Sequence, residues 1–197
     1  MPPAVKLTLV ASLRFLIPAM WCVWAAFWIA ASFGTKPTRW KESIASRASH
    51  VILLLAAVVL LMKPRWLPSM LSVRFAPAGN LLPVLAAIMV AAGLGFAVSA
   101  RVHLGRNWSG IVTVKEDHAL VRTGPYRVVR HPIYTGLLLA LIGTAMAIGE
   151  WRGFLAVICA LIGFLWKIHI EEKRMRENFP EYAQYSQQTA ALIPLLY

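Results

Sequence analysis

Residues 131–166 read HPIYTGLLLALIGTAMAIGEWRGFLAVICALIGFLW, and this stretch decides the fold. It holds two uncharged apolar runs, 131–149 and 153–166, separated only by the tripeptide EWR. A helix needs about 20 apolar residues to cross the hydrocarbon core of a bilayer, with roughly 17–25 usual. Pro132 suits the first turn of a helix, and the glycines on either side of the break favour a tight reversal. The stretch therefore predicts two membrane helices that form a hairpin.

The rest of the chain continues this pattern. Hydrophobic residues make up 59% of the 197 residues and charged residues only 14%, which is far from the composition of a soluble domain. The shorter apolar runs reach a membrane-spanning length only if flanking residues such as Lys63 or Lys167 extend to the interface. We therefore expect an all-α integral membrane protein with five transmembrane helices. The first three are expected at about 13–33, 46–63 and 81–103.

We expect one membrane domain over residues 1–197, with an N-terminal helical hairpin and connection (1–78) and a catalytic core (79–197). The third helix is rich in Ala and Gly, which let helix backbones approach closely, so this helix is expected to be central. The first apolar run is too long for a removable signal peptide and lacks a clear cleavage site. Cys22 and Cys159 lie inside apolar runs, which argues against a disulfide framework.

The net charge of +12 does not indicate a nucleic-acid partner. The positive charges separate the apolar runs instead of forming one face, and no nucleic-acid motif is present. With five spans, 14 of the 20 Lys and Arg residues fall on the side of the C-terminus. The positive-inside rule makes that side cytoplasmic, although three charges in residues 63–74 fall on the other side. We expect a multi-pass membrane protein whose active site faces the cytoplasm.

Polar residues are concentrated at the cytoplasmic ends of the expected spans, in residues 101–136 and 167–185. The inner parts of the spans contain no acidic residue, Lys or Arg, which argues against a transporter or channel. Within 101–136 we expect a β-prone stretch at 111–114 and turns at 115–118 and at Gly124-Pro125.

The spacing of polar residues within these two segments predicts shared helix faces. His131 and Tyr134 lie three residues apart at the start of the fourth helix, where free backbone N–H groups favour an anionic group. Lys167 and Glu171 lie four residues apart on the fifth helix. By spacing alone, the charged end of the fifth helix is equally consistent with a solvated face joined by Glu–Lys pairs.

These residues resemble a known family, the isoprenylcysteine carboxyl methyltransferases, within the wider group of membrane methyltransferases that includes phospholipid methyltransferases. The resemblance is firm over about residues 103–194 and only topological before that. The matching motifs, in chain order, are Leu104-Gly105-x-x-Trp108-Ser109, Gly124-x-Tyr126, Arg130-His131-Pro132-x-Tyr134-x-Gly136, Glu171-Glu172-x-x-Met175, and Tyr182…Tyr185…Ile193-Pro194.

The resemblance implies a membrane enzyme that uses S-adenosylmethionine, in a cytoplasmic pocket formed by the loop before helix four and the extension of helix five. No GxGxxG motif follows a strand, so a Rossmann-type nucleotide site has no support, and no metal site is predicted. Glu171 would pair with the cofactor's ammonium or accept hydrogen bonds from its ribose, and His131 with nearby N–H groups would bind its carboxylate. Tyr126 or Tyr134 would offer a ring face to the adenine or to a cation. By matching position, the implied cofactor contacts are His118, Ala119, Leu120, Val121, Tyr126, His131, Pro132, Ile133, Tyr134 and Glu171.

The implied acceptor is the carboxylate of an isoprenylcysteine-type lipid, which needs desolvation and one cation but no general base. Lys167 stands where the family has an Arg, so a single mobile charge replaces a planar fork. Arg130 is a second candidate for anchoring the substrate carboxylate, and His169 would serve as a base for an amine acceptor.

Several alternatives stay open. The acceptor can be a phospholipid amine or a small hydrophobic thiol. The chain can also be an NADPH-dependent sterol-type reductase, or a protein without enzymatic activity whose basic loops bind anionic lipid. The expected partners are the lipid bilayer and a lipid-borne or prenylated acceptor.

Overall fold

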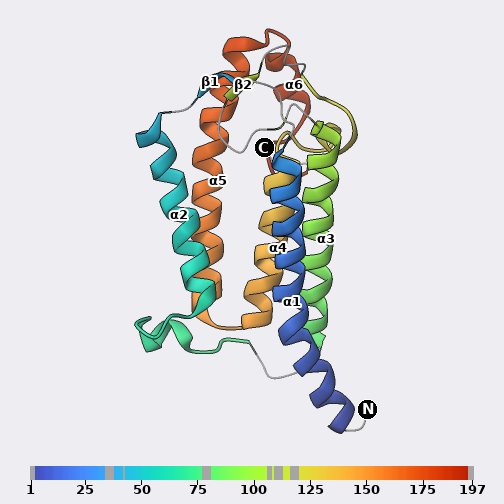
Figure 1. Ribbon diagram of the computed structural model, residues 1–197, viewed down its shortest axis with the longest axis vertical. Coiled ribbons are helices and arrows are strands. Elements are labelled where there is room, and N and C mark those ends of the chain that lie inside the picture. The colour runs from blue at the N-terminus through green and yellow to red at the C-terminus, as the bar shows by residue number, and fades with distance from the viewer. Residues whose placement is uncertain are drawn as a thin grey trace.

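Five long helices dominate the fold of the computed structural model (Figure 1). The structure describes residues 3–33, 38–41, 43–76, 81–105, 108, 113–115 and 120–194. In the view of Figure 1, α2 and α5 run side by side, and α4 lies with α1 and α3. The long helices are α1 (Pro3–Ser32), α2 (Ile44–Met62), α3 (Leu81–Leu104), α4 (Pro132–Ile148) and α5 (Trp151–Asn178). The short helical elements are η1 (Ser69–Ser72), η3 (Gly124–Arg127) and α6 (Tyr182–Gln188).

Three helices are long and apolar enough to cross a membrane, with candidate spans at Phe15–Ser32, Leu81–Leu104 and Trp151–Asn178. The apolar parts of the other two, Ser46–Met62 and Pro132–Ile148, are shorter. Large apolar side chains are exposed along these helices, as expected of surfaces that face lipid. The protein is therefore a helical integral membrane protein.

The expected helix bounds for α2 and α3 agree with the structure to within two residues. The first helix was expected from residue 13 but begins at Pro3. Charged residues interrupt an apolar run without interrupting a helix, since Lys and Arg have high helix propensity.

The α4–α5 hairpin predicted from residues 131–166 is present, with a shorter turn than the two flanking glycines suggest. Gly149 adopts the left-handed conformation (φ 63°) that ends α4, and its N–H donates to Ala145 O at 2.9 Å. The next helix already begins at Trp151. The Arg152 guanidinium donates to the carbonyl oxygens of Leu60 (2.8 Å) and Leu61 (2.6 Å) at the end of α2, which fixes α2 against α5.

The α3–α4 contact is as close as the small residues of α3 predicted. A Cβ atom on Gly93 would fall on the backbone of Gly136 and Ala140, and one on Gly136 would fall on the backbone of Gly93. About two turns further along α4, a Cβ on Gly143 would lie 2.7 Å from Ala86 O. The small residues of α3 therefore act in close packing against α4. The expected central position of α3 is not seen, because α3 packs mainly on α4 and α1 and lies at one edge of the bundle in Figure 1.

A small antiparallel sheet joins two connections that are distant in sequence. Strand β1 (Thr38–Lys41) pairs with β2 (Thr113–Lys115), with Trp40 opposite Val114. The β-prone stretch expected at 111–114 is found two residues later, whereas β1 was not predicted. The fold is helical as expected, and this two-stranded sheet is a small addition to it. The turn expected at 115–118 falls largely outside the described residues.

Candidate active site

The entrance to α4 is paired with the C-terminal segment of the chain. The backbone N–H groups of Arg130 and His131 donate to Ala190 O (2.9 Å) and Ala191 O (3.0 Å). One turn into the helix, Thr135 Oγ1 donates to Leu192 O at 2.6 Å. Residues 189–192 are named the C-terminal strap below. The amides of residues 130 and 131 therefore already have acceptors, so an anion at the start of α4 would have to use amides inside its first turn.

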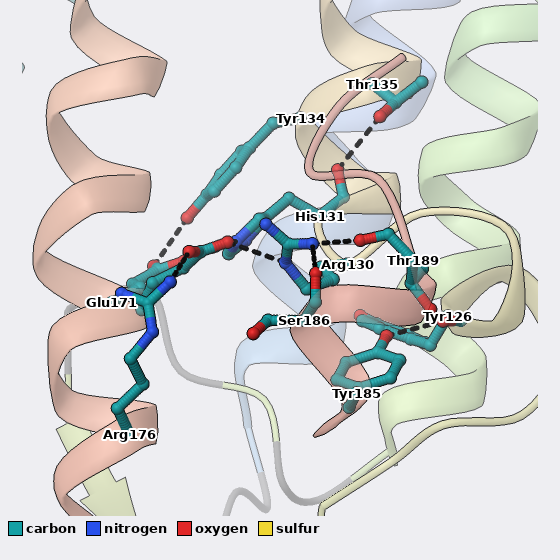
Figure 2. Close-up of polar contacts among 11 residues, drawn as sticks. Tyr126, Arg130, His131, Tyr134, Thr135, Glu171, Arg176, Tyr185, Ser186 and Thr189 are labelled. Carbon is teal, nitrogen blue, oxygen red and sulfur yellow. Dashed lines mark hydrogen bonds and ion pairs between the residues drawn. The ribbon is translucent and has the colours of Figure 1, made fainter. Parts of the chain in front are cut away.

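Arg130 joins the strap to α5. Its Nε donates to Glu172 Oε1 at 2.7 Å, and both side chains are only 9% exposed. Its Nη1 donates to Ser186 O (2.9 Å) and to Thr189 O. Arg176 completes the cluster by donating to Glu172 Oε2 at 2.8 Å, as Figure 2 shows. The contacts of Arg130 favour a structural role over the anchoring of a substrate carboxylate.

His131 lies between two glutamates of α5. Its Nδ1 is 3.4 Å from Glu171 Oε2, and its Nε2 is 3.4 Å from Glu172 Oε1. Burial would lower the pKa of His131, but the hydrogen bonds and the charges of both glutamates outweigh it and raise the pKa above its ordinary value. When it is protonated, the ring can donate from both nitrogens, one toward each glutamate.

Tyr134 and Glu171 form the other half of the cluster. The Tyr134 hydroxyl donates to Glu171 Oε1 at 2.7 Å. The ring of Tyr134 stacks between His131 (5.7 Å between ring centroids) and Phe164 (5.2 Å). Lys167 Nζ lies 5.5 Å from the centroid of the same ring. The side chain of Glu171 is 22% exposed, more than the other carboxylate of the pair, so Glu171 is the one that a ligand can reach.

Tyr126 is positioned by η3, on the opposite side of Arg130 and His131 from Glu171 in the view of Figure 2. Gly124 begins this turn with φ 59°, and a Cβ there would meet the His103 ring at 2.7 Å. His103 bonds Thr123 Oγ1 at 2.8 Å and stacks on the Tyr126 ring at 6.4 Å. The turn expected at Gly124-Pro125 is therefore confirmed, and it packs on the end of α3.

Two buried tyrosines of this region remain neutral at physiological pH. Burial raises the pKa of Tyr126 above its ordinary value and raises the pKa of Tyr185 to about 12. The neutral Tyr185 hydroxyl donates to Tyr126 O at 2.5 Å and so ties α6 to η3.

The remaining predicted contacts lie around this cluster or outside the description. Pro132 is fully buried at the first position of α4, whereas Ile133, Leu120 and Val121 are partly buried. The predicted contacts His118 and Ala119 fall outside the described residues. Within the part of the chain that the structure describes, no group of three or more His, Cys, Asp or Glu side chains is arranged to bind a metal ion.

Sequence reasoning did not assign a role to Glu172 or to the strap. The sequence did point to Glu172, because two adjacent glutamates are unusual in a chain that has only eight acidic residues. A helix turns 100° per residue, so the two carboxylates need different partners. The strap left no such signal, since its bonds to α4 come from backbone carbonyls.

Comparison with known protein families shows to which family the chain belongs. The sequence profile of the phospholipid methyltransferases matches residues 81–182, which is just over half of the chain. The chain belongs to the phospholipid methyltransferase family. The match runs from the start of α3 into α6 and so contains the whole cluster around His131 and Glu171.

Individual relatives support the narrower resemblance. The chain is 36% identical over 102 residues to the protein-S-isoprenylcysteine O-methyltransferase of Schizosaccharomyces pombe, covering 50% of this chain and 43% of that protein. It is also 30% identical over 106 residues to the cobalt-zinc-cadmium resistance protein CzcN of Cupriavidus metallidurans, covering 52% and 49%. The chain thus spans about half the length of the curated relatives that it matches.

A solved structure shows the same fold. The eukaryotic intramembrane Ras methyltransferase, isoprenylcysteine carboxyl methyltransferase, superposes with a TM-score of 0.56 at 24% sequence identity. The match covers 75% of this chain and 52% of that one. The resemblance to the isoprenylcysteine carboxyl methyltransferases, which the motifs predicted, is confirmed.

Proposed function

We propose that this chain is a membrane methyltransferase that uses S-adenosylmethionine and methylates the carboxylate of an isoprenylcysteine-type lipid. The observation that carries the proposal is the hydrogen-bonded cluster of His131, Tyr134 and Glu171 at one end of the apolar helices. The cluster combines a reachable carboxylate with aromatic faces beside surfaces suited to lipid. Family membership and the names of the relatives support the same chemistry.

The side chains of this cluster fit the adenosyl part of the cofactor. Glu171 has the hydroxyl of Tyr134 and the ring of His131 as partners, and they fix its carboxylate for ribose hydroxyls or an ammonium. The ring faces of Tyr126 and Tyr134 suit an adenine or a sulfonium. When bound, the cofactor would supply a methyl group on a sulfonium for an in-line displacement. Leu120, Val121, Pro132 and Ile133 are proposed to line this site together with His118 and Ala119.

The remaining task of the protein is to position a desolvated carboxylate. We assign this role to Lys167, which lies one helical turn before Glu171 and near the face of Tyr134. Its single positive charge would hold the acceptor carboxylate without a general base. Arg130 is the weaker candidate, because Glu172 and two carbonyl oxygens already bind its guanidinium.

We further propose that all five long helices cross the bilayer and that the cluster faces the cytoplasm. The 17-residue apolar helices Ser46–Met62 and Pro132–Ile148 would rise about 25 Å, close to the thickness of the hydrocarbon core. The distribution of Lys and Arg supports the orientation.

The binding test uses the purified protein in detergent. Titration with S-adenosylhomocysteine should release heat and raise the unfolding temperature, whereas NADPH should do neither. Methyl transfer from S-adenosylmethionine to N-acetyl-S-farnesylcysteine should then exceed transfer to phosphatidylethanolamine. Failure to bind S-adenosylhomocysteine would contradict the proposed class, and binding of NADPH would select a reductase.

An amine or thiol acceptor is the second candidate function. The family takes its description from phospholipids, and Lys167 replaces the arginine expected for a carboxylate. Preferred methylation of phosphatidylethanolamine, or of a small hydrophobic thiol, in the same assay would support this alternative. The proposed cofactor site would be unchanged.

A further inference from the structure

Arg101 is a buried cation at the same end of the helix bundle, in the last turn of α3. The residue is 5% exposed. Its Nη1 donates to Gly105 O at 2.8 Å and its Nη2 donates to Ala31 O at the end of α1. The face of its guanidinium lies 4.4 Å from the centroid of the Trp108 ring. Arg101 therefore joins the ends of α1 and α3 through backbone carbonyls and one aromatic ring.

Two other buried arginines have a carboxylate partner, whereas Arg101 has none among the described residues. Arg130 pairs with Glu172 at 2.7 Å, and Arg152 pairs with Glu150 at 2.7 Å. Among the residues that the structure describes, no carboxylate lies within 4.0 Å of Arg101. Its buried Nε has no hydrogen-bond acceptor. A buried charge is stable only when it is paired, so this edge of the guanidinium favours an anionic group.

Arg101 lies two residues before His103, whose ring stacks on that of Tyr126 at 6.4 Å between centroids, so Arg101 is on the Tyr126 side of the proposed cofactor site. After burial, which is the largest influence, the charges of Glu171 and Arg101 act on the pKa of Tyr126 in opposite directions. Tyr126 therefore has an acidic group from α5 and a basic group from α3 in its electrostatic surroundings. A ligand with positive and negative groups along its length suits such a site.

Several of the groups first predicted to bind the cofactor's carboxylate are already used. The amides of Arg130 and His131 donate to the C-terminal strap. Both ring nitrogens of His131 contact glutamates. Lys167 lies against the Tyr134 ring, on the α5 side of the cluster. Among the arginines that the structure describes, Arg101 has a buried Nε without a hydrogen-bond acceptor.

We propose that the Nε edge of Arg101 binds the carboxylate of the methionyl part of the cofactor. The inference rests on the proposed function, since it assigns a group within that same site. It adds a residue that the sequence motifs did not include and makes Arg101 both a link between α1 and α3 and a ligand-binding residue. A charge-assisted hydrogen bond of this kind changes affinity by about 10- to 100-fold.

The test compares two ligands on three forms of the full-length protein by isothermal titration. One ligand is S-adenosylhomocysteine, and the other is its decarboxylated analogue, 5′-deoxy-5′-(3-aminopropylthio)adenosine, which keeps the ammonium. Arg101→Gln should weaken binding of S-adenosylhomocysteine by about 10- to 100-fold and leave the analogue nearly unchanged. The control Arg122→Gln, which removes an exposed cation 3.8 Å from Glu181, should change neither affinity.

The outcomes separate the possible roles of Arg101. Equal weakening of both ligands would overturn the proposal and leave Arg101 as a helix link only. Unchanged cofactor binding with a raised acceptor KM would also overturn it, since the carboxylate would then belong to the acceptor. Wild-type protein that binds neither ligand would contradict the proposed function itself. If Arg101→Gln does not fold, Arg101→Lys, which keeps the charge but not the Nε edge, should show the same selective loss. An unchanged affinity for S-adenosylhomocysteine, or an equal loss for both ligands, would refute the proposal.

Discussion

The hydroxyl of Tyr134 donates a 2.7 Å hydrogen bond to Oε1 of Glu171 and thereby joins the first turn of α4 to the charged extension of α5. The two residues come from the two helices of the hairpin, at the ends far from their connecting turn (Figure 1). The reachable carboxylate of the site is thus oriented by a residue on another helix. A ligand that binds Glu171 is expected to depend on this contact.

Tyr134→Phe tests the orientation of Glu171. The variant keeps the ring that stacks on His131 and Phe164 but removes the hydroxyl donor. We expect affinity for S-adenosylhomocysteine to fall by about 1–2 kcal/mol, since the lost bond is to a charged acceptor. Isothermal titration measures the change, and an unchanged unfolding temperature would confirm that the stack remains. Full affinity in Tyr134→Phe would contradict a role for Glu171 in binding.

Arg130→Ala tests whether Arg130 is structural. The substitution leaves Glu172 buried without its 2.7 Å partner, which costs about 3–5 kcal/mol for a buried pair. The unfolding temperature in detergent should fall clearly, and Glu172→Gln should cost less because its amide keeps an acceptor oxygen for Arg130. If Arg130→Ala instead folds normally and raises only the acceptor KM, then Arg130 is a substrate anchor after all.

The pH dependence of the protein's stability should reflect the protonation of His131. Its pKa in the folded protein is raised above the ordinary 6.5 by the two glutamates, so it gains a stabilising proton on folding. This contribution is complete below pH 6.5 and is lost as the pH rises through the folded pKa. The unfolding temperature should therefore decline as the pH rises above 6.5. His131→Gln should flatten this slope, and an equal slope in the variant would assign it to another group.

The close α3–α4 packing can be tested with a matched pair of glycines. Gly93→Ala places a methyl group on the backbone of Gly136, and overpacking of this kind costs about 1–3 kcal/mol. Gly95→Ala, two residues away on the same helix, meets no atom within 4 Å and should be neutral or slightly stabilising. Thermal unfolding of both variants in detergent measures the difference. Equal stability would show that α3 and α4 are not in backbone contact.

Lys167→Ala separates the acceptor from the cofactor. If Lys167 holds the acceptor carboxylate, the variant should raise the KM for N-acetyl-S-farnesylcysteine by about tenfold or more, since it removes a charged partner. Its affinity for S-adenosylhomocysteine should change much less. Steady-state kinetics and titration on the same preparation measure both, and a loss of cofactor affinity alone would show that the role assignment is wrong.

The sequence predicts those features of the fold that depend on apolar length and local turns. The α4–α5 hairpin follows from two uncharged runs and Gly149, and the close approach of α3 follows from its small residues. The bounds of α1 were less accurate, because hydropathy marks the membrane-spanning part of a helix and not its hydrogen-bonded extent. Strand β1 was missed since its pairing with β2 is nonlocal.

Sequence reasoning predicted the parts of the candidate site that follow from residue type and helical spacing. Helical spacing placed His131 and Tyr134 on one turn, and the structure brings both to Glu171. The partner of Arg130 could not be inferred, because Glu172 is 42 positions away and nothing local selects it over Glu171. Bonds to backbone carbonyls leave no pattern in a sequence, so the pairing of the amides of residues 130 and 131 with residues 190 and 191 could not be predicted either.

The C-terminal strap has a consequence for biogenesis. Ribosomal synthesis makes residues 189–192 after α4 and α5, so both helices exist before Arg130 and the amides of residues 130 and 131 have these acceptors. Synthesis of the helices and completion of the site are thus separate events in time. A nascent chain can have all its long helices in place and still be unable to hold His131 and Arg130 in their final positions.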